Sequence, residues 1–501
     1  MENNIENLQP KRKRIVRKTE VFSFTLERPK IIDIDIPIIN KIGEFAKEFG
    51  VKVYVVGGFV RDKLLGRNVK DIDFTVVGNA IDFVEYVGRN IKKNPIIYER
   101  FKTALLVADE YNLEFVGTRK ETYEKHSRKP IVSDGSLEDD IKRRDFTVNA
   151  LAVSLNKENY GELIDMYGGY DDLQKKILRT PLDPGVTFSD DPLRMMRAAR
   201  FASQLNFEIE ETCLQHLSEM SDRIQIISQE RISEEFFKIL DSSNPGKGLH
   251  ILYNSGILKW IFPELDNLAG VDLVEKEEKV FAHKDVFRHS VKVLENIVPM
   301  TNNRWLRFAA LIHDIAKPKT KRFVHGTGWT FHGHEDLGAK WMSKIFRRMK
   351  FPLDHLEYVE KLVRLHQRPM QLVDEEVTDS AIRRLAFQAG DALEDLFTLV
   401  RADITTKNPN LTQQYRNNYE KVFQKVIEVQ ERDKLREFQS PVRGEEIMEI
   451  CQIEPSRLVG YLKEQIEEAI LDGVIPNDYE PAKEFFINNK DNWMKQYNQL
   501  N

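Results

Sequence analysis

The feature that constrains this chain most is a segment near its amino end, VYVVGGFVRDKLLGRNVKDIDF, at residues 53–74. Its apolar start predicts a strand, its paired glycines a tight turn, and the residues after them a short helix leading into a second strand. The second strand carries Asp71 and Asp73. Because side chains alternate between the faces of a strand, both carboxylates point the same way while Ile72 faces the core. Two aligned carboxylates can hold Mg²⁺.

The glycine pair predicts where a phosphate could lie. Gly57 and Gly58 lack a β-carbon, so main-chain amides can approach phosphate oxygens, and the helix that starts near Phe59 directs its positive end there. Arg61 could clasp a phosphate from that helix. Either motif alone is typical of an ordinary strand, turn and helix with surface acids. In this order, they favour a metal-dependent nucleotidyl-transfer site.

Two further segments make the pattern specific, RRDFTVNALA at residues 143–152 and FSDDPLRMMRAARFASQLNF at residues 188–207. With the first motif they resemble the class II CCA-adding tRNA nucleotidyltransferases, a family of the DNA polymerase beta-like superfamily that includes the bacterial poly(A) polymerases. The resemblance covers roughly residues 36–240. It implies an α+β fold, an Mg²⁺-dependent nucleotidyl transfer, and tRNA, CTP and ATP as partners.

The resemblance also implies individual roles. Asp71 and Asp73 would bind the catalytic metals, and Glu114, within the apolar stretch LEFVGTR, is the expected third carboxylate. Asp109 and Glu110 are its alternatives, and a solvent-facing strand residue is the other interpretation of Glu114. The residues expected to bind the nucleotide are Gly57, Gly58, Arg61, Arg144, Asp191, Arg194, Arg197 and Arg200.

The third segment predicts how a base could be selected. Asp191 and Arg194 lie three residues apart and are expected on one side of a helix, presenting an acceptor beside donors. Cytosine and adenine each offer an exocyclic amino donor next to a ring nitrogen acceptor, which this pair would match, whereas uracil and guanine reverse both contacts. Arg197 and Arg200 continue the stripe and could neutralise phosphates. A solvated basic helix face is the alternative, and Asp190 stands where the family usually has Glu.

In RRDFTVNALA, Asp145 and Asn149 lie among apolar residues. They are either structural polar anchors or substrate contacts, because buried polar groups are usually hydrogen-bonded for structural reasons. The segment ERISEEFFKIL, at residues 230–240, resembles a helix-stabilising motif of the family and is interpreted as architecture.

A different chemistry is predicted in the middle of the chain, where eight of the 11 histidines fall between His283 and His366. The segments FRHSVKVL, RFAALIHDIAKPK, FHGHEDLGAKW, LVRLHQRP and LVRADIT resemble an HD-type phosphohydrolase domain. Their apolar residues recur at helical spacing, so the ligands would converge inside a helix bundle. By family pattern, one divalent transition-metal ion would be bound by His289, His313, Asp314 and Asp403. A second ion would be bound by His334 and His366. Hydrogen-bonded core histidines are the alternative.

Composition limits the remaining possibilities. No run of about 18 apolar residues and no secretory signal is present, so we expect no membrane segment and a cytoplasmic location. The two cysteines, Cys213 and Cys451, fit a reducing compartment without a disulfide framework or a zinc site. A net charge of -5 predicts that any RNA surface is local. The sequence does not indicate an oligomeric state.

The expected fold is α+β, an N-terminal mixed-sheet nucleotidyltransferase head followed by an all-α neck, an HD helical domain and a helical tail. The expected divisions are a basic arm at residues 1–30, the head at 31–180, the neck with the nucleotide template and RNA-binding region at 181–282, the HD domain at 283–408, and a tail at 409–501 that could hold tRNA.

Three functions remain open. The first is template-independent addition of CCA to tRNA 3′ ends, with two-metal stabilisation and an HD domain that can hydrolyse phosphate esters. The second is poly(A) addition, which the segment YERFKTALL disfavours because it lacks a glycine usual in those enzymes. The third is a metal phosphohydrolase whose front domain only binds RNA.

Overall fold

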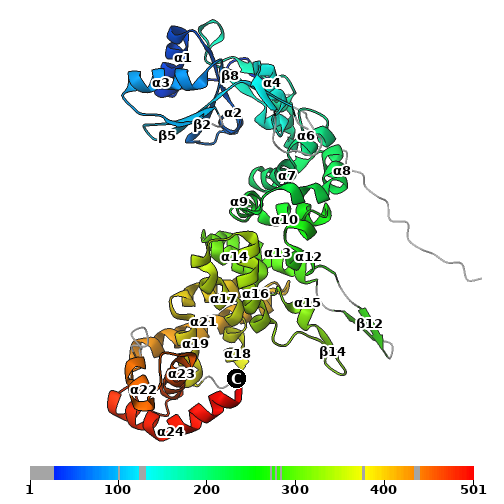
Figure 1. Ribbon diagram of the computed structural model, residues 1–501. Coiled ribbons are helices and arrows are strands. Elements are labelled where there is room, and N and C mark those ends of the chain that lie inside the picture. The colour runs from blue at the N-terminus through cyan, green and yellow to red at the C-terminus, as the bar shows by residue number, and fades with distance from the viewer. Residues whose placement is uncertain are drawn as a thin grey trace, which may run out of the picture. The chain divides into compact units, whose positions relative to one another are not determined.

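The computed structural model of the protein (Figure 1) describes residues 28–99, 102–122, 131–270, 273–276, 279–282, 285–374, 378–433 and 440–500. The chain forms two compact units, one of Met1–Gly117 with Leu151–Asp165 and one of Thr118–Ala150 with Met166–Asn501. Nearly all of the predicted basic arm, including the cluster KRKRIVRK, lies outside the described residues. The five predicted divisions are finer than these two units, and their boundaries stay a prediction.

The first unit is built on one sheet of seven strands in the order β3-β4-β5-β2-β1-β8-β9. Strands β2 and β5 run parallel, whereas the other neighbours are antiparallel. The strands are β1 Lys52–Val56, β2 Asp71–Val77, β3 Ile96–Tyr98, β4 Thr103–Ala108, β5 Tyr111–Gly117, β8 Ala152–Ser154 and β9 Leu163–Ile164.

Helices α1 (Pro37–Phe49) and α3 (Ala80–Ile91) pack against each other and against this sheet, as Figure 1 shows. Asn79 caps α3 by accepting hydrogen bonds from two amides of its first turn. Phe83 of α3 meets Phe115 edge-on, and Phe115 stacks on Phe74 at 4.6 Å between ring centroids. Because strand side chains alternate, the opposite face of β2 and β5 is left for polar residues.

The second unit begins with the pair β6 (Arg119–Thr122) and β7 (Ile131–Asp134) and continues mainly as helices. Helix α7 (Leu193–Leu205) packs against α9 (Gln229–Leu240) and α10 (Pro245–Asn254). The other helices before residue 270 are α4 Leu137–Lys142, α5 Gly169–Lys175, α6 Pro184–Asp190, α8 Glu211–Glu219, α11 Leu258–Ile261 and α12 Pro263–Asp266.

A bundle of helices follows from residue 286. Its core helices are α13 (Val286–Ile297), α14 (Arg304–Ile312), α16 (His334–Met349), α17 (Leu356–Leu365) and α20 (Leu393–Ala402). Gly338 allows α16 to approach α17, since a β-carbon there would lie 3.1 Å from Val363 Cγ1. The remaining helices are α15 Lys317–Thr320, α18 Arg368–Asp374, α19 Asp379–Ala389 and α21 Pro409–Asp433.

The neck and the bundle share one aromatic core. Phe237 of α9 lies 4.9 Å from the ring of Trp305 and 4.6 Å from that of Phe351, both on the bundle side. Arg307, which is 5% exposed, donates hydrogen bonds to the carbonyls of Leu240, Val298 and Thr301. A buried guanidinium with several carbonyl partners is stable only where those partners stay in place. The packing therefore fixes α9 against the bundle.

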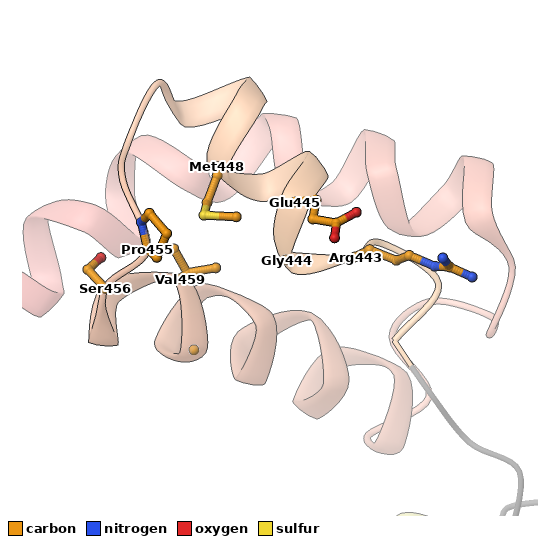
Figure 2. Close-up of a pocket in the computed structure, with 8 residues that line it drawn as sticks. Arg443, Gly444, Glu445, Met448, Pro455, Ser456 and Val459 are labelled. Atoms are coloured by element: carbon orange, nitrogen blue, oxygen red, sulfur yellow. The ribbon is translucent and has the colours of Figure 1, made fainter.

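The carboxyl-terminal part is a small helical module of α22 (Gly444–Cys451), α23 (Arg457–Leu471) and α24 (Tyr479–Leu500). Its core is a set of buried apolar residues that includes Ile447, Leu462 and Phe486. An open groove of about 490 Å³ lies between α22 and α23. Figure 2 shows Arg443 at one side of it and Ser456 at the other. The predicted helical tail is thus observed.

The predicted α+β class is confirmed, with the mixed sheet in the first unit and helices in the second. The sequence missed three short strand pairs in the helical part: β10–β11 (Ile177–Leu178 with Glu208–Ile209), β12–β13 (Leu273–Lys276 with Lys279–Ala282) and β14–β15 (Arg322–Val324 with Gly328–Thr330). Strands of two to four residues are too short for an alternating pattern to stand out. Among the described residues, no helix is both long enough and apolar enough to cross a membrane.

Candidate functional site

The carboxylates of the first motif lie together on the open face of the sheet. Asp71 and Asp73 are on β2, on the face opposite Ile72, which is completely buried. Asp73 is the direct neighbour of Glu114 across the parallel β2–β5 pair. Asn112, two residues before Glu114, donates a hydrogen bond of 2.8 Å to Asp71 Oδ1. The predicted common orientation of the two aspartates is observed, and Glu114 joins them from the neighbouring strand.

These acids repel one another. Partial burial, and next the charge of Asp73, raises the pKa of Glu114 above its ordinary value. Within the described part of the chain, the three carboxylates do not form a group whose ligand atoms all lie within 4.8 Å of one another. A divalent cation bound between these carboxylates would offset their repulsion.

The glycine turn has the predicted shape. Gly57 has φ +73°, which favours glycine, and Gly58 begins α2 (Gly58–Leu64). The Gly57 amide donates to the carbonyl of Leu151, so it is already satisfied. Arg61 is 8% exposed and donates two hydrogen bonds to Asp62. The phosphate-binding role of Gly57, Gly58 and Arg61 stays a prediction.

In the second unit, Arg144 is held by a buried acid. Asp140, with no exposed surface, accepts hydrogen bonds from both Arg143 and Arg144. Burial would raise the pKa of Asp140, but the two guanidinium charges outweigh burial and lower it. Arg144 also donates to the carbonyl of Asn149. A role of Arg144 at the nucleotide stays a prediction, and Asp140 is the residue that orients it.

Asp191 is not on a helix, which corrects one expectation. It lies between α6 and α7, with an extended backbone at φ -140° and ψ 99°. The cause is Pro192, because a proline disfavours the helical conformation of the residue before it. Asp191 Oδ1 accepts from the Leu193 amide, and Arg194 donates to the carbonyls of Thr187 and Arg143. Asp191 therefore precedes the helix that carries Arg194.

Arg197 and Arg200, the next two residues of the stripe, are engaged in ion pairs. Arg197 pairs with Asp145 at 2.5 Å and Arg200 pairs with the buried Glu235 of α9 at 2.6 Å. The segment that contains Glu235 was interpreted as architecture, and this pair joins it to α7. Asp145 also accepts from the Phe146 amide and from Asn149, which makes it a structural anchor. Nucleotide contacts of the two arginines stay predictions.

The Asp145–Arg197 pair predicts a pH-dependent stability. Burial raises the pKa of Asp145, but the charge of Arg197 and the hydrogen bond from Asn149 outweigh it, so that pKa lies below its ordinary range. The ionised carboxylate therefore stabilises the fold above pH 4, and that contribution disappears as pH falls further. We expect Asp145→Asn to lower the free energy of unfolding by about 2 kcal/mol at pH 7. This loss is smaller than for a fully buried pair, because the Arg197 side chain is one-third exposed.

Urea unfolding at pH 7, 5 and 4 tests this expectation. The difference between wild type and Asp145→Asn should be constant from pH 7 to pH 5 and should narrow at lower pH. Glu208→Gln is the control, because it removes the partner of Lys247 at a side chain that is 82% exposed. Equal effects of the two substitutions would contradict the anchor role.

The histidines and aspartates of the predicted HD centre converge in the bundle. Asp314 lies between two pairs of histidines. Its Oδ2 is 3.5 Å from His289 Nε2 and 3.3 Å from His313 Nε2. Its Oδ1 is 3.2 Å from His334 Nε2 and 3.6 Å from His366 Nε2. Asp403 Oδ1 is 2.9 Å from His289 Nε2. All six predicted ligands are thus within one cluster.

Backbone contacts fix the orientation of three of the imidazoles. The Nδ1 atoms of His313, His334 and His366 lie 2.7–2.8 Å from the carbonyl three residues earlier. A carbonyl oxygen only accepts, so Nδ1 must carry a proton, and Nε2 is the nitrogen that faces the cluster. This is the arrangement in which histidine binds a metal.

The cluster fits a divalent cation. His313 Nε2, Asp314 Oδ1 and Asp403 Oδ1 are buried, and within the described part of the chain their close contacts are to one another and to the other ligands of the cluster, none with the geometry of an ordinary hydrogen bond. Burial lowers the pKa of His313, yet the carboxylates of Asp314 and Asp403 outweigh it and raise that pKa to about 9. The charge of His313, and next the hydrogen bond and charge of His289, hold the pKa of Asp403 at about 2 despite burial. Nitrogen and carboxylate ligands together suit a divalent transition metal.

Three residues at this centre were not predicted. Lys317 Nζ bonds Asp314 Oδ2 at 2.6 Å, Gln367 Nε2 lies 3.3 Å from His334 Nε2, and Thr405 Oγ1 lies 3.2 Å from His289 Nδ1. Each is one to three residues from a predicted ligand, so a search of ligand neighbours would have found them. His325 and His332, in the glycine-containing loop, are exposed.

Comparisons with known proteins match three stretches of the chain. The model of the poly(A) polymerase head domain matches residues 53–179, that of a probable RNA and SrmB-binding site of polymerase A matches residues 206–268, and that of the HD domain matches residues 286–393. The chain thus combines a nucleotidyltransferase head with an HD domain.

Relatives define the family. The chain is 35% identical over 332 residues to the multifunctional CCA protein of Haemophilus influenzae, covering 63% of this chain and 75% of that protein. It is 33% identical over 321 residues to the A-adding tRNA nucleotidyltransferase of Aquifex aeolicus, where the match covers 61% of this chain but only 35% of the relative. The chain belongs to this family of tRNA nucleotidyltransferase enzymes, as its motifs predicted.

A solved structure supports the same fold. The crystal structure of a tRNA nucleotidyltransferase complexed with a primer tRNA and an incoming ATP analogue is 25% identical to this chain, with a TM-score of 0.56. The likeness covers 76% of this chain and 98% of that one.

Proposed function

We propose that the protein adds CCA to tRNA 3′ ends from CTP and ATP without a nucleic-acid template. The observation that carries this proposal is the carboxylate site of β2 and β5, where Asp73 and Glu114 are direct neighbours and Asp71 lies on the same face. Asp71 and Asp73 would hold Mg²⁺, with Glu114 as a third ligand. Bound Mg²⁺ would neutralise the triphosphate and orient the attacking ribose hydroxyl.

The residues of the second unit would select the base. Asp191 would accept from the amino group of cytosine or adenine, and Arg194 would donate to the neighbouring ring nitrogen. Two hydrogen bonds of Arg194 to carbonyls support this role, because they restrain the guanidinium before a base arrives. Arg197 and Arg200 support the site indirectly, through their pairs with Asp145 and Glu235.

Nucleotide addition to a tRNA that lacks its last three residues tests the proposal. CTP alone should give two additions, and both nucleotides together should give three and then stop. Addition of a single A only to tRNA that already ends in CC would instead indicate an A-adding enzyme, and long A tails would indicate a poly(A) polymerase. Either result would overturn CCA addition.

We expect Arg194→Ala to lower discrimination against UTP and GTP by about 10²-fold or more, because a site that satisfies specific hydrogen bonds rejects a mismatched base through unpaired groups. The KM for CTP should change less than this ratio. Arg194→Lys keeps the charge but not the planar pair of donors, so it should lose discrimination too. Unchanged preference for C and A in both variants would remove the template role.

We propose hydrolysis of phosphate esters as a second activity, and the six converging ligands of the HD centre favour it. His289, His313, Asp314 and Asp403 would hold one divalent transition-metal ion, and His334 and His366, on the other side of Asp314, a second. A bound ion would polarise the ester and lower the pKa of water. Lys317, paired with Asp314, would keep that carboxylate ionised and oriented.

Two finer points also belong to this proposal. The groove of the tail module, with Arg443 at its edge, is a candidate contact for tRNA outside the acceptor end. Relatives named for tRNA addition, together with a chain of two cysteines, support a cytoplasmic location.

A further inference from the structure

A basic segment follows His313 and Asp314 of the HD centre directly in the sequence. Residues 315–334 contain Lys317, Lys319, Lys321 and Arg322 and no acidic residue, in a chain whose net charge is -5. Residues 317–331 comprise α15 and the β14–β15 pair, and we call them the basic hairpin. Lys319 and Arg322 are exposed, and neither side chain forms an ion pair with any residue that the structure describes. The charges of Lys319 and Arg322 therefore face solvent, and neither takes part in an ion pair that holds the basic hairpin together.

The hairpin has an aromatic face and a polar face. Phe323 and Trp329 are cross-strand partners with ring centroids 5.4 Å apart, and Lys321 Nζ lies 5.1 Å from the Trp329 ring. Arg322 and Thr330 are the next pair and lie on the other face. Cations interleaved with aromatic rings suit single-stranded nucleic acid, whose phosphates pair with the cations while its bases stack on rings.

Hydrogen bonds tie this hairpin to the metal ligands. The carbonyl of Phe331 accepts from Thr320 Oγ1 at its base and lies 2.8 Å from Nδ1 of His334. Lys317 at its start bonds Asp314. A strand of RNA held along the hairpin would therefore have its end near the residues that hold the metal.

We propose that the basic hairpin binds the sugar-phosphate backbone of a single-stranded RNA 3′ end and leads that end to the HD centre. The proposal rests on the phosphohydrolase function proposed above. A free nucleotide would need one phosphate-binding point, whereas cations spaced along an arm match successive phosphates. The substrate class of the HD centre is accordingly an RNA terminus.

Binding provides the first test. Full-length protein is titrated, in EDTA, into a fluorescent 12-nucleotide RNA ending in a 3′-phosphate. The double variant Lys319→Glu, Arg322→Glu should raise Kd about tenfold, and losing two contacts should reduce the slope of log K against log salt by about 1.4. The control Lys344→Glu, Arg347→Glu reverses one lysine and one arginine at the same spacing on α16, where both are exposed. It should change Kd less than twofold.

Hydrolysis provides the second test. With metal present, the hairpin variant should raise the KM for an RNA ending in a 2′,3′-cyclic phosphate about tenfold, by the same loss of phosphate contacts, and leave hydrolysis of bis(p-nitrophenyl) phosphate unchanged. An equal loss of RNA binding in both double variants, or none in the hairpin variant, would overturn the proposal. If wild-type protein hydrolyses neither substrate, the phosphohydrolase function fails, while the binding measurement still decides the role of the hairpin.

Discussion

Replacing Asp73 with asparagine is expected to lower the rate of nucleotide addition by about 10³-fold, which corresponds to several kcal/mol of lost metal-dependent stabilisation. The substitution keeps the shape of the side chain on β2 and removes one of the charges that meets Glu114. Hydrolysis of phosphate esters at the HD centre should not change. The measurement is incorporation of labelled CTP into a truncated tRNA beside hydrolysis of bis(p-nitrophenyl) phosphate.

The same variant should not be less stable than wild type when no metal is present. The charge of Asp73 contributes to the raised pKa of Glu114, so removing it relieves a repulsion. Asp109→Asn is a matched control, because Asp109 is an alternative acid at the turn before β5 and its φ of +53° is one that asparagine tolerates. Addition that persists in Asp73→Asn, or that falls equally in Asp109→Asn, would remove the assignment of the metal site.

Replacing Asp314 with asparagine is expected to have the opposite effect on the two activities, lowering ester hydrolysis and sparing nucleotide addition. Both oxygens of Asp314 face imidazole nitrogens, so one substitution weakens both halves of the cluster. Hydrolysis of bis(p-nitrophenyl) phosphate should fall by about 10³-fold, with nucleotide addition retained. Added metal should raise the melting temperature of wild type, because a ligand that binds only the native state stabilises it, and should not raise that of the variant.

Asp354→Asn is the control for this prediction, since it makes the same change at a side chain in the same bundle that is 72% exposed. It should leave metal content, melting temperature and both activities unchanged. If Asp314→Asn stays folded but loses nucleotide addition as well, the two activities are not independent. If metal content and hydrolysis persist, the cluster is a hydrogen-bonded core rather than a metal centre.

Local pattern was enough to predict part of this structure. The alternation of β2 placed Asp71 and Asp73 on one face, and helical spacing placed the histidines in a bundle, because both depend only on residues near in sequence. Contacts between side chains that are far apart in the sequence could not be predicted in this way. The contact of Arg197 with Asp145 spans 52 residues, and that of Arg200 with Glu235 joins two helices. The sequence therefore predicted nucleotide contacts for both arginines but did not predict these ion pairs.

A second kind of error had a local signal. Asp191 was expected on a helix, but Pro192 directly after it favours an extended conformation, which the structure shows. The short strand pairs have no such signal, apart from the glycine between β14 and β15, because their strands are too short for an alternating pattern to stand out. Residues such as Lys317 were missed because they act through a ligand rather than as one.

The aromatic packing of Phe237 against Trp305 and Phe351, with Arg307 reaching back to the carbonyl of Leu240, has a consequence for anyone who wishes to dissect this enzyme. Cutting the chain ahead of α13 would separate Phe237 from Trp305 and Phe351 and expose these large rings to water, which favours aggregation. Truncation is therefore unsuitable for separating the two activities. Single-residue substitutions can remove nucleotide addition or ester hydrolysis while the other activity is kept.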